Sequence, residues 1–264
     1  MHDFKYSRPD NLTEALAAFR EAGDGRFLAG GQTIIPVMKQ RLAMPSDVID
    51  LAGVEELSGI AAGDDGVTIG AMIRHAQVAA SGDVRSRIPA LAELAGLIGD
   101  PHVRNRGTLG GSIANNDPAA DYPAAVVGLG ATVVTDRREI AGDDFFTGMF
   151  ETALEPGELI VKVAFPVPEK AAYAKIPNPA SRYAIVGVMV SRGAQGVRVA
   201  VTGAGPCVFR LDAMEDALAA DFTAGAVNGV VVPADGLNAD IHASAEYRAH
   251  LIGVMAARAV GAAG

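Results

Sequence analysis

The segment Gly99–Pro123, GDPHVRNRGTLGGSIANNDPAADYP, restricts the fold of this chain more than any other part of it. It is dense in Gly, Pro, Asp and Asn, whereas a loop that only connects two elements needs one or two turn residues. Glycine also lets a backbone come close to another group, because it has no side chain in the way. We therefore expect this segment to present exposed backbone to a ligand.

A shorter double-glycine turn lies earlier, in AGGQT, between a predicted strand (RFLA) and a predicted helix that contains Pro36. The amides of Gly30 and Gly31, with those of Gln32 and Thr33, would form a cradle for an anion such as a diphosphate. A plain turn leading into a helix explains the same residues, and this alternative stays open. The turn is not a P-loop, because no Gly-Lys-Ser/Thr follows, and it lacks the GxGxxG pattern.

The run TLGGS contains a second glycine pair, inside the longer segment, with a hydroxyl side chain on each side of it. Asn115 and Asp117 add polar groups nearby. Asp121 could accept a hydrogen bond from a ribose hydroxyl, or cap the helix that follows it. Two such cradles on different parts of the chain fit the two ends and the diphosphate of a dinucleotide. Arg104 and Arg106 could neutralise a phosphate, but in a chain this acidic they are expected to pair with carboxylates such as those of Asp100 or Asp117.

Composition excludes several classes of function. The formal net charge is −9, which argues against nucleic acid and anionic membranes as partners, since both need a concentrated basic face. A single cysteine, Cys207, permits no internal disulfide and no cysteine-based metal site. The histidines have neither HxxH nor HExxH spacing, so we expect no metal, and no GxSxG elbow supports nucleophilic catalysis. The longest apolar stretch is too short to span a bilayer, and we expect a cytoplasmic protein.

Hydrophobic periodicity predicts an α+β fold with mixed sheets. Asn11 and Glu14 match a capping box at the start of the first helix, and Asp212 and Glu215 match another. The proline-punctuated run FPVPEKAAYAKIPNP is the clearest candidate linker. We expect three parts: residues 1–55, 56–168 and 169–264.

Three motifs, in this order and spacing, carry a resemblance: AGGQTIIPVMKQRL, TIGAMIRHAQV and GDPHVRNRGTLGGSIANNDPAADYPAAVVGLGA. They resemble the FAD-binding medium subunit of molybdenum hydroxylases, the family of the carbon monoxide dehydrogenase flavoprotein and of the flavin domain of xanthine dehydrogenase. The resemblance covers essentially the whole chain. It implies a two-subdomain FAD-binding fold of the vanillyl-alcohol-oxidase or p-cresol-methylhydroxylase type, followed by a C-terminal α+β flavoprotein domain.

The resemblance also implies which residues contact the cofactor. The first loop would bind the diphosphate, and the second would contribute the other side of the site. Ile98 falls where the family places an apolar side chain against the flavin ring, and Tyr183 falls where relatives carry an aromatic or acidic residue. The full expected set is Ala29, Gly30, Gly31, Gln32, Thr33, Ile34, Ile98, Thr108, Gly110, Gly111, Ser112, Asn115, Asp117, Asp121, Ile160, Lys175 and Tyr183.

In function, the resemblance implies a subunit that passes electrons from iron–sulfur clusters to an external acceptor. The molybdenum cofactor and the clusters would lie on a large and a small partner subunit, in a dimer of heterotrimers. FAD would be noncovalent, because no family pattern marks His75 or His102 as an attachment site. No catalytic residue is expected in this chain. Two alternatives stay open: a self-contained flavin oxidase or dehydrogenase of the same fold, and a binding module that has lost FAD.

Overall fold

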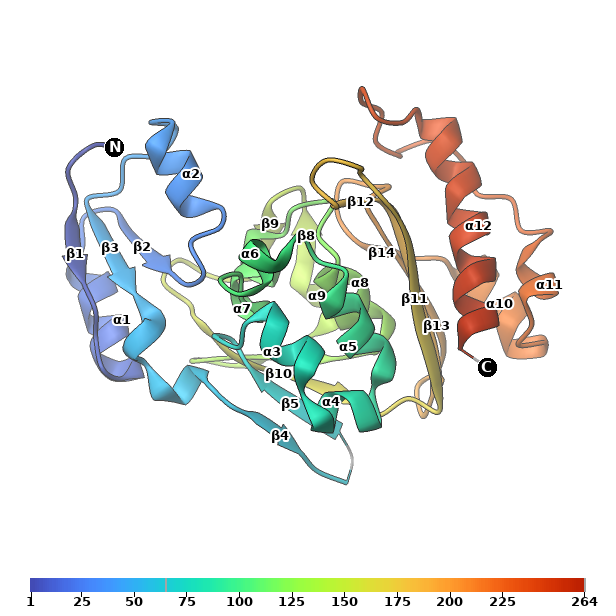
Figure 1. The fold of residues 1–264 in the computed structure, drawn as a ribbon, viewed down its shortest axis with the longest axis horizontal. Helices are drawn as coiled ribbons and strands as arrows, with labels where there is room; N and C mark the ends of the chain where they lie inside the picture. Colours follow the sequence, from blue (N-terminus) through green and yellow to red (C-terminus); the bar gives the residue numbers. More distant parts are fainter. Residues whose placement is uncertain (65, 264) are drawn as a thin grey trace.

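The computed structural model describes residues 1–64 and 66–263, which form three sheets arranged in chain order (Figure 1). We call them the N-terminal, central and C-terminal sheets. A fourth pairing joins only two short strands, β8 (Phe146–Gly148) and β9 (Glu151–Thr152). Within the described residues, no helix combines the length and the hydropathy needed to cross a bilayer.

The N-terminal sheet is parallel, with strand order β1-β3-β2. The capping interaction predicted for its first helix is confirmed, since Oδ1 of Asn11 accepts from the amide of Glu14 at 2.9 Å. Leu159, from much later in the chain, is buried in the same core as Ile49 and Leu57. The elements of this part are β1 (Lys5–Ser7), α1 (Leu12–Glu21), β2 (Gly25–Leu28), α2 (Ile34–Lys39), β3 (Asp47–Asp50) and the 3-10 turns Leu51–Gly53 and Glu55–Leu57.

The central sheet is antiparallel, with order β4-β5-β10-β6-β7, and a layer of short helices covers it (Figure 1). The segment Gly99–Pro123, which we expected to be largely exposed backbone, instead contains two complete helices and the start of a third. The elements are β4 (Ile60–Ala62), β5 (Gly66–Gly70), α3 (His75–Ala80), α4 (Gly82–Arg87), α5 (Pro89–Gly96), α6 (Pro101–Arg104), α7 (Leu109–Asn115), α8 (Tyr122–Gly128), β6 (Thr132–Thr135), β7 (Glu139–Ala141), α9 (Gly142–Phe145) and β10 (Ile160–Pro166).

The C-terminal sheet is antiparallel, with order β11-β12-β13-β14, and it is covered on both faces. Successive residues of β12 show why: Val188 and Val190 belong to the core under α12, whereas Met189 belongs to the core of the central part. The sheet thus lies between α12 and the central helices (Figure 1). The elements are β11 (Lys170–Pro177), β12 (Ala184–Gly193), β13 (Gly196–Thr202), β14 (Phe209–Arg210), α10 (Asp212–Ala220), α11 (Ala224–Val227) and α12 (Ala245–Ala262).

Two local predictions are wrong. The expected linker FPVPEKAAYAKIPNP is mostly strand, because β11 occupies Lys170–Pro177 and pairs with β12 along its whole length. The expected capping box of α10 is absent: Leu211 is its N-cap, and the Glu215 carboxylate accepts from Arg210 and from the amide of Val199. The division into residues 1–55, 56–168 and 169–264 stays a prediction.

Candidate functional site

The first glycine turn is a loop between β2 and α2 whose amides have no hydrogen-bond acceptor among the described residues. In the part of the chain that the structure describes, none of the amides of residues 30–34 donates a hydrogen bond to another protein atom. Gly31 has a φ of +73°, a conformation that other residues adopt only with strain. The side chains of Gln32 and Thr33 are exposed. The loop therefore has free amide donors, and two of its side chains are open to solvent.

The second glycine pair is built differently, because it forms the first turn of α7. Thr108 is the N-cap, and its Oγ1 accepts from the amide of Gly111 at 3.1 Å. The other early amides also have protein acceptors: Leu109 donates to Ile73, Gly110 to Ala71, and Ser112 to Thr108, over 2.9 to 3.0 Å. The expectation of a second cradle of free amides is therefore wrong. This segment can offer a ligand its hydroxyl and amide side chains, but not the amides of residues 109–112.

The structure brings the two glycine segments into direct contact. A Cβ on Gly30 would overlap the carbonyl oxygen of Arg106 and lie 2.7 Å from Cα of Gly107. A Cβ on Gly111 would lie 3.5 Å from Cβ of Ala29. Glycine at position 30 is therefore required by the contact between the two parts of the chain.

Asp121, Lys175 and Tyr173 form a buried polar cluster where the central helices meet the C-terminal sheet. The Lys175 ammonium lies 2.9 Å from Oδ1 of Asp121, and the Tyr173 hydroxyl donates to the same oxygen at 2.6 Å. Burial raises the pKa of Asp121, while the Lys175 charge and the Tyr173 hydrogen bond act in the opposite direction. The alternative role of Asp121 as a helix cap is wrong, since its side chain makes no capping hydrogen bond to α8.

The same lysine connects the two loops that carry Ile98 and Tyr183. Its Nζ donates to the carbonyl oxygens of Leu97, at 3.0 Å, and Arg182, at 2.8 Å. Tyr183 is 44% exposed, and partial burial together with nearby carboxylates raises its pKa. Lys175 thus holds the backbone directly before each of the two side chains that are expected to lie against the flavin ring.

Arg104 stabilises this arrangement through the backbone instead of through a carboxylate. Its Nη1 donates to the carbonyl oxygens of Ile98 and Gly99, both at 3.0 Å. In residues 1–64 and 66–263, neither Arg104 nor Arg106 forms an ion pair, so the expected pairing with Asp100 or Asp117 is wrong.

The remaining expected residues differ in how accessible they are. Ser112 and Asn115 lie half-buried on α7, and Asp117 accepts from the amide of Ala119 at 2.9 Å. Ile34 is half-buried at the start of α2. Ile160 is only 3% exposed and belongs to the central core, so the structure does not bring its side chain to the surface of the site.

Sequence reasoning missed Asn116, which follows α7 and is completely buried. Its φ of +42° ends the helix, and its side-chain amide donates to the carbonyl oxygens of Gly148 and Glu151. Phe150 donates its amide to the backbone carbonyl of Asn116 at 3.1 Å. The NND run was a signal for a left-handed helix end, because Asn tolerates positive φ.

These features fit a dinucleotide cofactor. The unpartnered amides of residues 30–34 are the donors that a diphosphate requires, and Gly30 and Gly31 carry no side chain of their own. No three His, Cys, Asp or Glu side chains among the described residues are grouped so that they could bind a metal ion.

Comparison with known proteins gives an independent result. A family model described as the FAD binding domain in molybdopterin dehydrogenase matches residues 2–168. The carbon monoxide dehydrogenase medium chain of Hydrogenophaga pseudoflava is 34% identical, over 98% of this chain and 96% of that protein. The nicotine 6-hydroxylase medium subunit of Paenarthrobacter nicotinovorans is also 34% identical, over 98% and 97% of the two chains.

A solved structure agrees with these matches. The structure of carbon monoxide dehydrogenase from Hydrogenophaga pseudoflava, in a form lacking the Mo-pyranopterin moiety of the molybdenum cofactor, contains a similar chain. It superimposes with a TM-score of 0.88 at 35% identity, over 99% of this chain and 97% of that one.

Proposed function

We propose a function from the premise that this chain belongs to the family of FAD-binding domains of molybdopterin dehydrogenases. It is the FAD-binding electron-transfer subunit of a molybdenum and iron–sulfur hydroxylase. The observation that carries the proposal is the contact between a loop of free amides and the start of α7, within a fold shared along almost the whole length of medium chains.

Bound FAD would supply the redox chemistry, taking up electrons and releasing them to an acceptor, while the protein supplies binding, orientation and electrostatics. The amides of residues 30–34 would bind the diphosphate, with the hydroxyls of Thr33 and Ser112 beside them. Ile98 and Tyr183 would cover the ring and exclude water. Lys175 and Asp121 orient the loops that carry those two side chains. No residue of the chain is assigned a proton-transfer step.

The partners would be a large molybdenum-binding subunit and a small iron–sulfur subunit, in a dimer of heterotrimers. The relatives are named medium chains or subunits of enzymes acting on carbon monoxide and on nicotine, which supports an assembly of several chains. Because those substrates differ so widely, the substrate would be determined by the large subunit and not by this chain. The cytoplasmic location is part of the same proposal.

The test begins with the purified chain and added FAD. We expect a yellow protein that releases intact FAD on denaturation, and co-expression with molybdenum and iron–sulfur subunits should give a stable complex. Colour that stays on the denatured chain would show a covalent flavin. Turnover of a small organic substrate by the isolated chain would favour the self-contained oxidase instead.

A further inference from the structure

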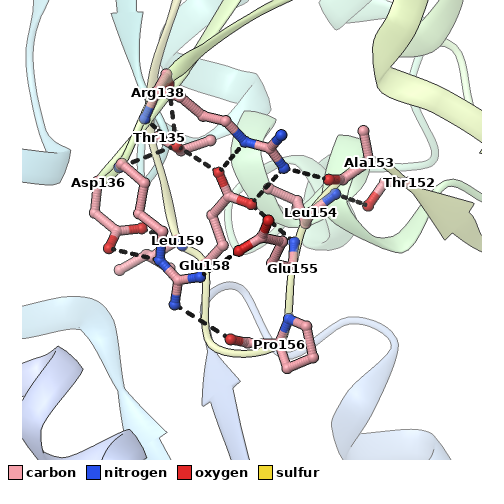
Figure 2. A network of polar contacts seen from close by, with 11 residues as sticks. Thr135, Asp136, Arg138, Thr152, Ala153, Leu154, Glu155, Pro156, Glu158 and Leu159 are labelled. Carbon is pink, nitrogen blue, oxygen red and sulfur yellow. Dashed lines mark hydrogen bonds and ion pairs between the residues drawn. The ribbon is translucent and has the colours of Figure 1, made fainter.

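A buried carboxylate lies away from both glycine segments, in the turn between β9 and β10. The side chain of Glu158 is 0% exposed, and Figure 2 shows it surrounded by donors. Its oxygens accept from Nε of Arg138 at 3.0 Å, from Nη2 at 2.9 Å, from the hydroxyl of Thr135 at 2.8 Å and from the amide of Glu155 at 2.8 Å. Such a fully bonded charge fixes the geometry of the residues around it.

This network determines the path of residues 153–159. Arg138 also donates to the carbonyl oxygen of Ala153 at 2.7 Å. At the other end, the amide of Leu159 donates to Oδ1 of Asp136 at 2.7 Å, and the Asp136 amide donates back to Leu159 at 3.0 Å (Figure 2). Both ends of the turn are thus tied to the hairpin between β6 and β7.

The turn packs against α1 and the core of the N-terminal part of the chain. A Cβ on Gly157, whose φ is +73°, would lie 2.7 Å from the ring of Phe19. Phe19 stacks on Phe27 with ring centroids 4.7 Å apart, and Leu159 is buried in the same core. Phe27 belongs to β2, which leads directly into residues 29–34.

The strand that follows the turn also supports the second glycine segment. The carbonyl of Val161 in β10 accepts from the amide of Ala71 at 2.9 Å. The carbonyl of Ala71 in turn accepts from the amide of Gly110 at 2.9 Å. One end of this short stretch therefore contacts Phe19 of α1, which stacks on Phe27 in the strand before the first loop. The other end supports the start of α7 through Ala71.

We propose that Glu158 and Arg138 are positioning residues for FAD binding, which set the relative position of the two glycine segments. The proposal rests on the function proposed above. Neither residue contacts the cofactor site. When the network is broken, the two segments are correctly placed in only a fraction of molecules, and the apparent affinity falls by that fraction.

The experiment measures the FAD dissociation constant of the full chain by quenching of flavin fluorescence. We expect Glu158→Gln to raise this constant about tenfold, and Arg138→Lys, which keeps the charge but has fewer donors, to raise it less.

The matched control is Glu215→Gln. Glu215 is also buried and also bonded to an arginine and a backbone amide, but it lies in the C-terminal part. It should lower the melting temperature similarly and leave the dissociation constant unchanged.

A second measurement follows hydrogen exchange of the β2 amides in the chain without FAD. Glu158→Gln should speed their exchange, whereas Glu215→Gln should not. Equal effects of the two variants on FAD affinity, or no effect of Glu158→Gln and Arg138→Lys, would overturn the positioning role. If Glu158→Gln fails to fold, Arg138→Lys decides. A wild-type chain that binds no FAD would instead overturn the proposed function.

Discussion

The loop of residues 29–34 and the start of α7 at residues 108–112 both place a glycine pair beside a threonine, yet the backbone amides differ completely in their partners. In the first segment they have no protein acceptor within the described residues. In the second, four successive amides donate to other protein atoms. The two threonines differ as well: Thr108 caps its helix, whereas Thr33 makes no capping bond.

The glycines are required for different reasons in the two segments. In the first, Gly30 permits close contact with Arg106 and Gly107, and Gly31 adopts a positive φ. In the second, a Cβ on Gly110 would lie 2.6 Å from that of Ala71, so glycine there permits α7 to pack against the turn that follows β5. The same sequence pattern thus produces a loop of unbonded amides in one place and a packed helix start in the other.

The largest effect is expected from a substitution at Gly30 that obstructs the contact between the two glycine segments. Gly30→Ala should cost about 3 kcal/mol of unfolding free energy, because the obstacle is backbone that does not move aside easily. It should also abolish FAD retention. Denaturant titration and flavin absorbance measure the two effects. Gly229→Ala, made where a Cβ meets nothing within 4 Å, is the control and should change neither. A Gly30→Ala protein with full flavin would show that the contact is dispensable.

The stability of the protein should depend on pH through His75, which contacts the backbone just before the second glycine segment. His75 donates its backbone amide to Gly107, its ring lies against that residue, and burial lowers its pKa to about 4 from an ordinary 6.5. The neutral form is therefore favoured by folding. The stabilisation that comes from keeping His75 neutral is complete above pH 6.5 and is lost as the pH falls toward 4. In total it amounts to about 3 kcal/mol of unfolding free energy. Denaturation at several pH values should show the slope, and His75→Gln should remove it. An unchanged slope in His75→Gln would refute the assignment.

Backbone conformation at Gly31 should matter more than the size of the side chain. Gly31→Val should cost about 2 kcal/mol, because it combines a positive φ with a Cβ 2.6 Å from Cδ1 of Ile35. Gly31→Asn should cost less, since Asn tolerates this conformation. Thermal denaturation ranks the variants. Equal losses for Val and Asn would indicate that steric overlap, and not the positive φ, is the cause.

The smallest effects are expected from substituting the two threonines, which should differ in what they change. Thr108→Val removes the cap of α7 and should cost about 1 kcal/mol, with a minor change in FAD affinity. Thr33→Val should change stability by less than about 0.5 kcal/mol, because the hydroxyl has no capping role, and should weaken FAD binding. Denaturation and flavin titration of both variants give a two-by-two comparison. The reverse pattern would mean that we have assigned the wrong segment to the diphosphate.

Local signals in the sequence predicted most elements correctly. Asn11 before an apolar period indicated α1, and the alternating residues of β12 and β13 indicated strands, because both patterns depend on neighbours in the chain. The first glycine loop was also placed correctly between β2 and α2. The strand β11 was missed because prolines at both ends of its run suggested a linker, whereas pairing with β12 along its whole length stabilises it.

Polar side chains were harder to assign. Asp212, Glu215 and Asp121 all occupied positions typical of helix caps, but Glu215 and Asp121 instead bond to arginine or lysine residues that the fold brings to them. Arg104 was expected to find a carboxylate and instead donates to two carbonyl groups. A buried charged side chain bonds to whichever polar groups the fold brings near it, and those groups can be distant in sequence.

The sequence alone determined the kind of ligand, because closely spaced glycines beside hydroxyl and amide side chains restrict the backbone locally, and their order along the chain resembles one family. Only the tertiary structure decided which amides are free. Whether an amide donates to a ligand or to Ala71 depends on a turn that is distant in sequence, and so does the contact between Gly30 and Arg106. Hydrogen-bond satisfaction is a property of the packed molecule, so the local pattern did not contain it.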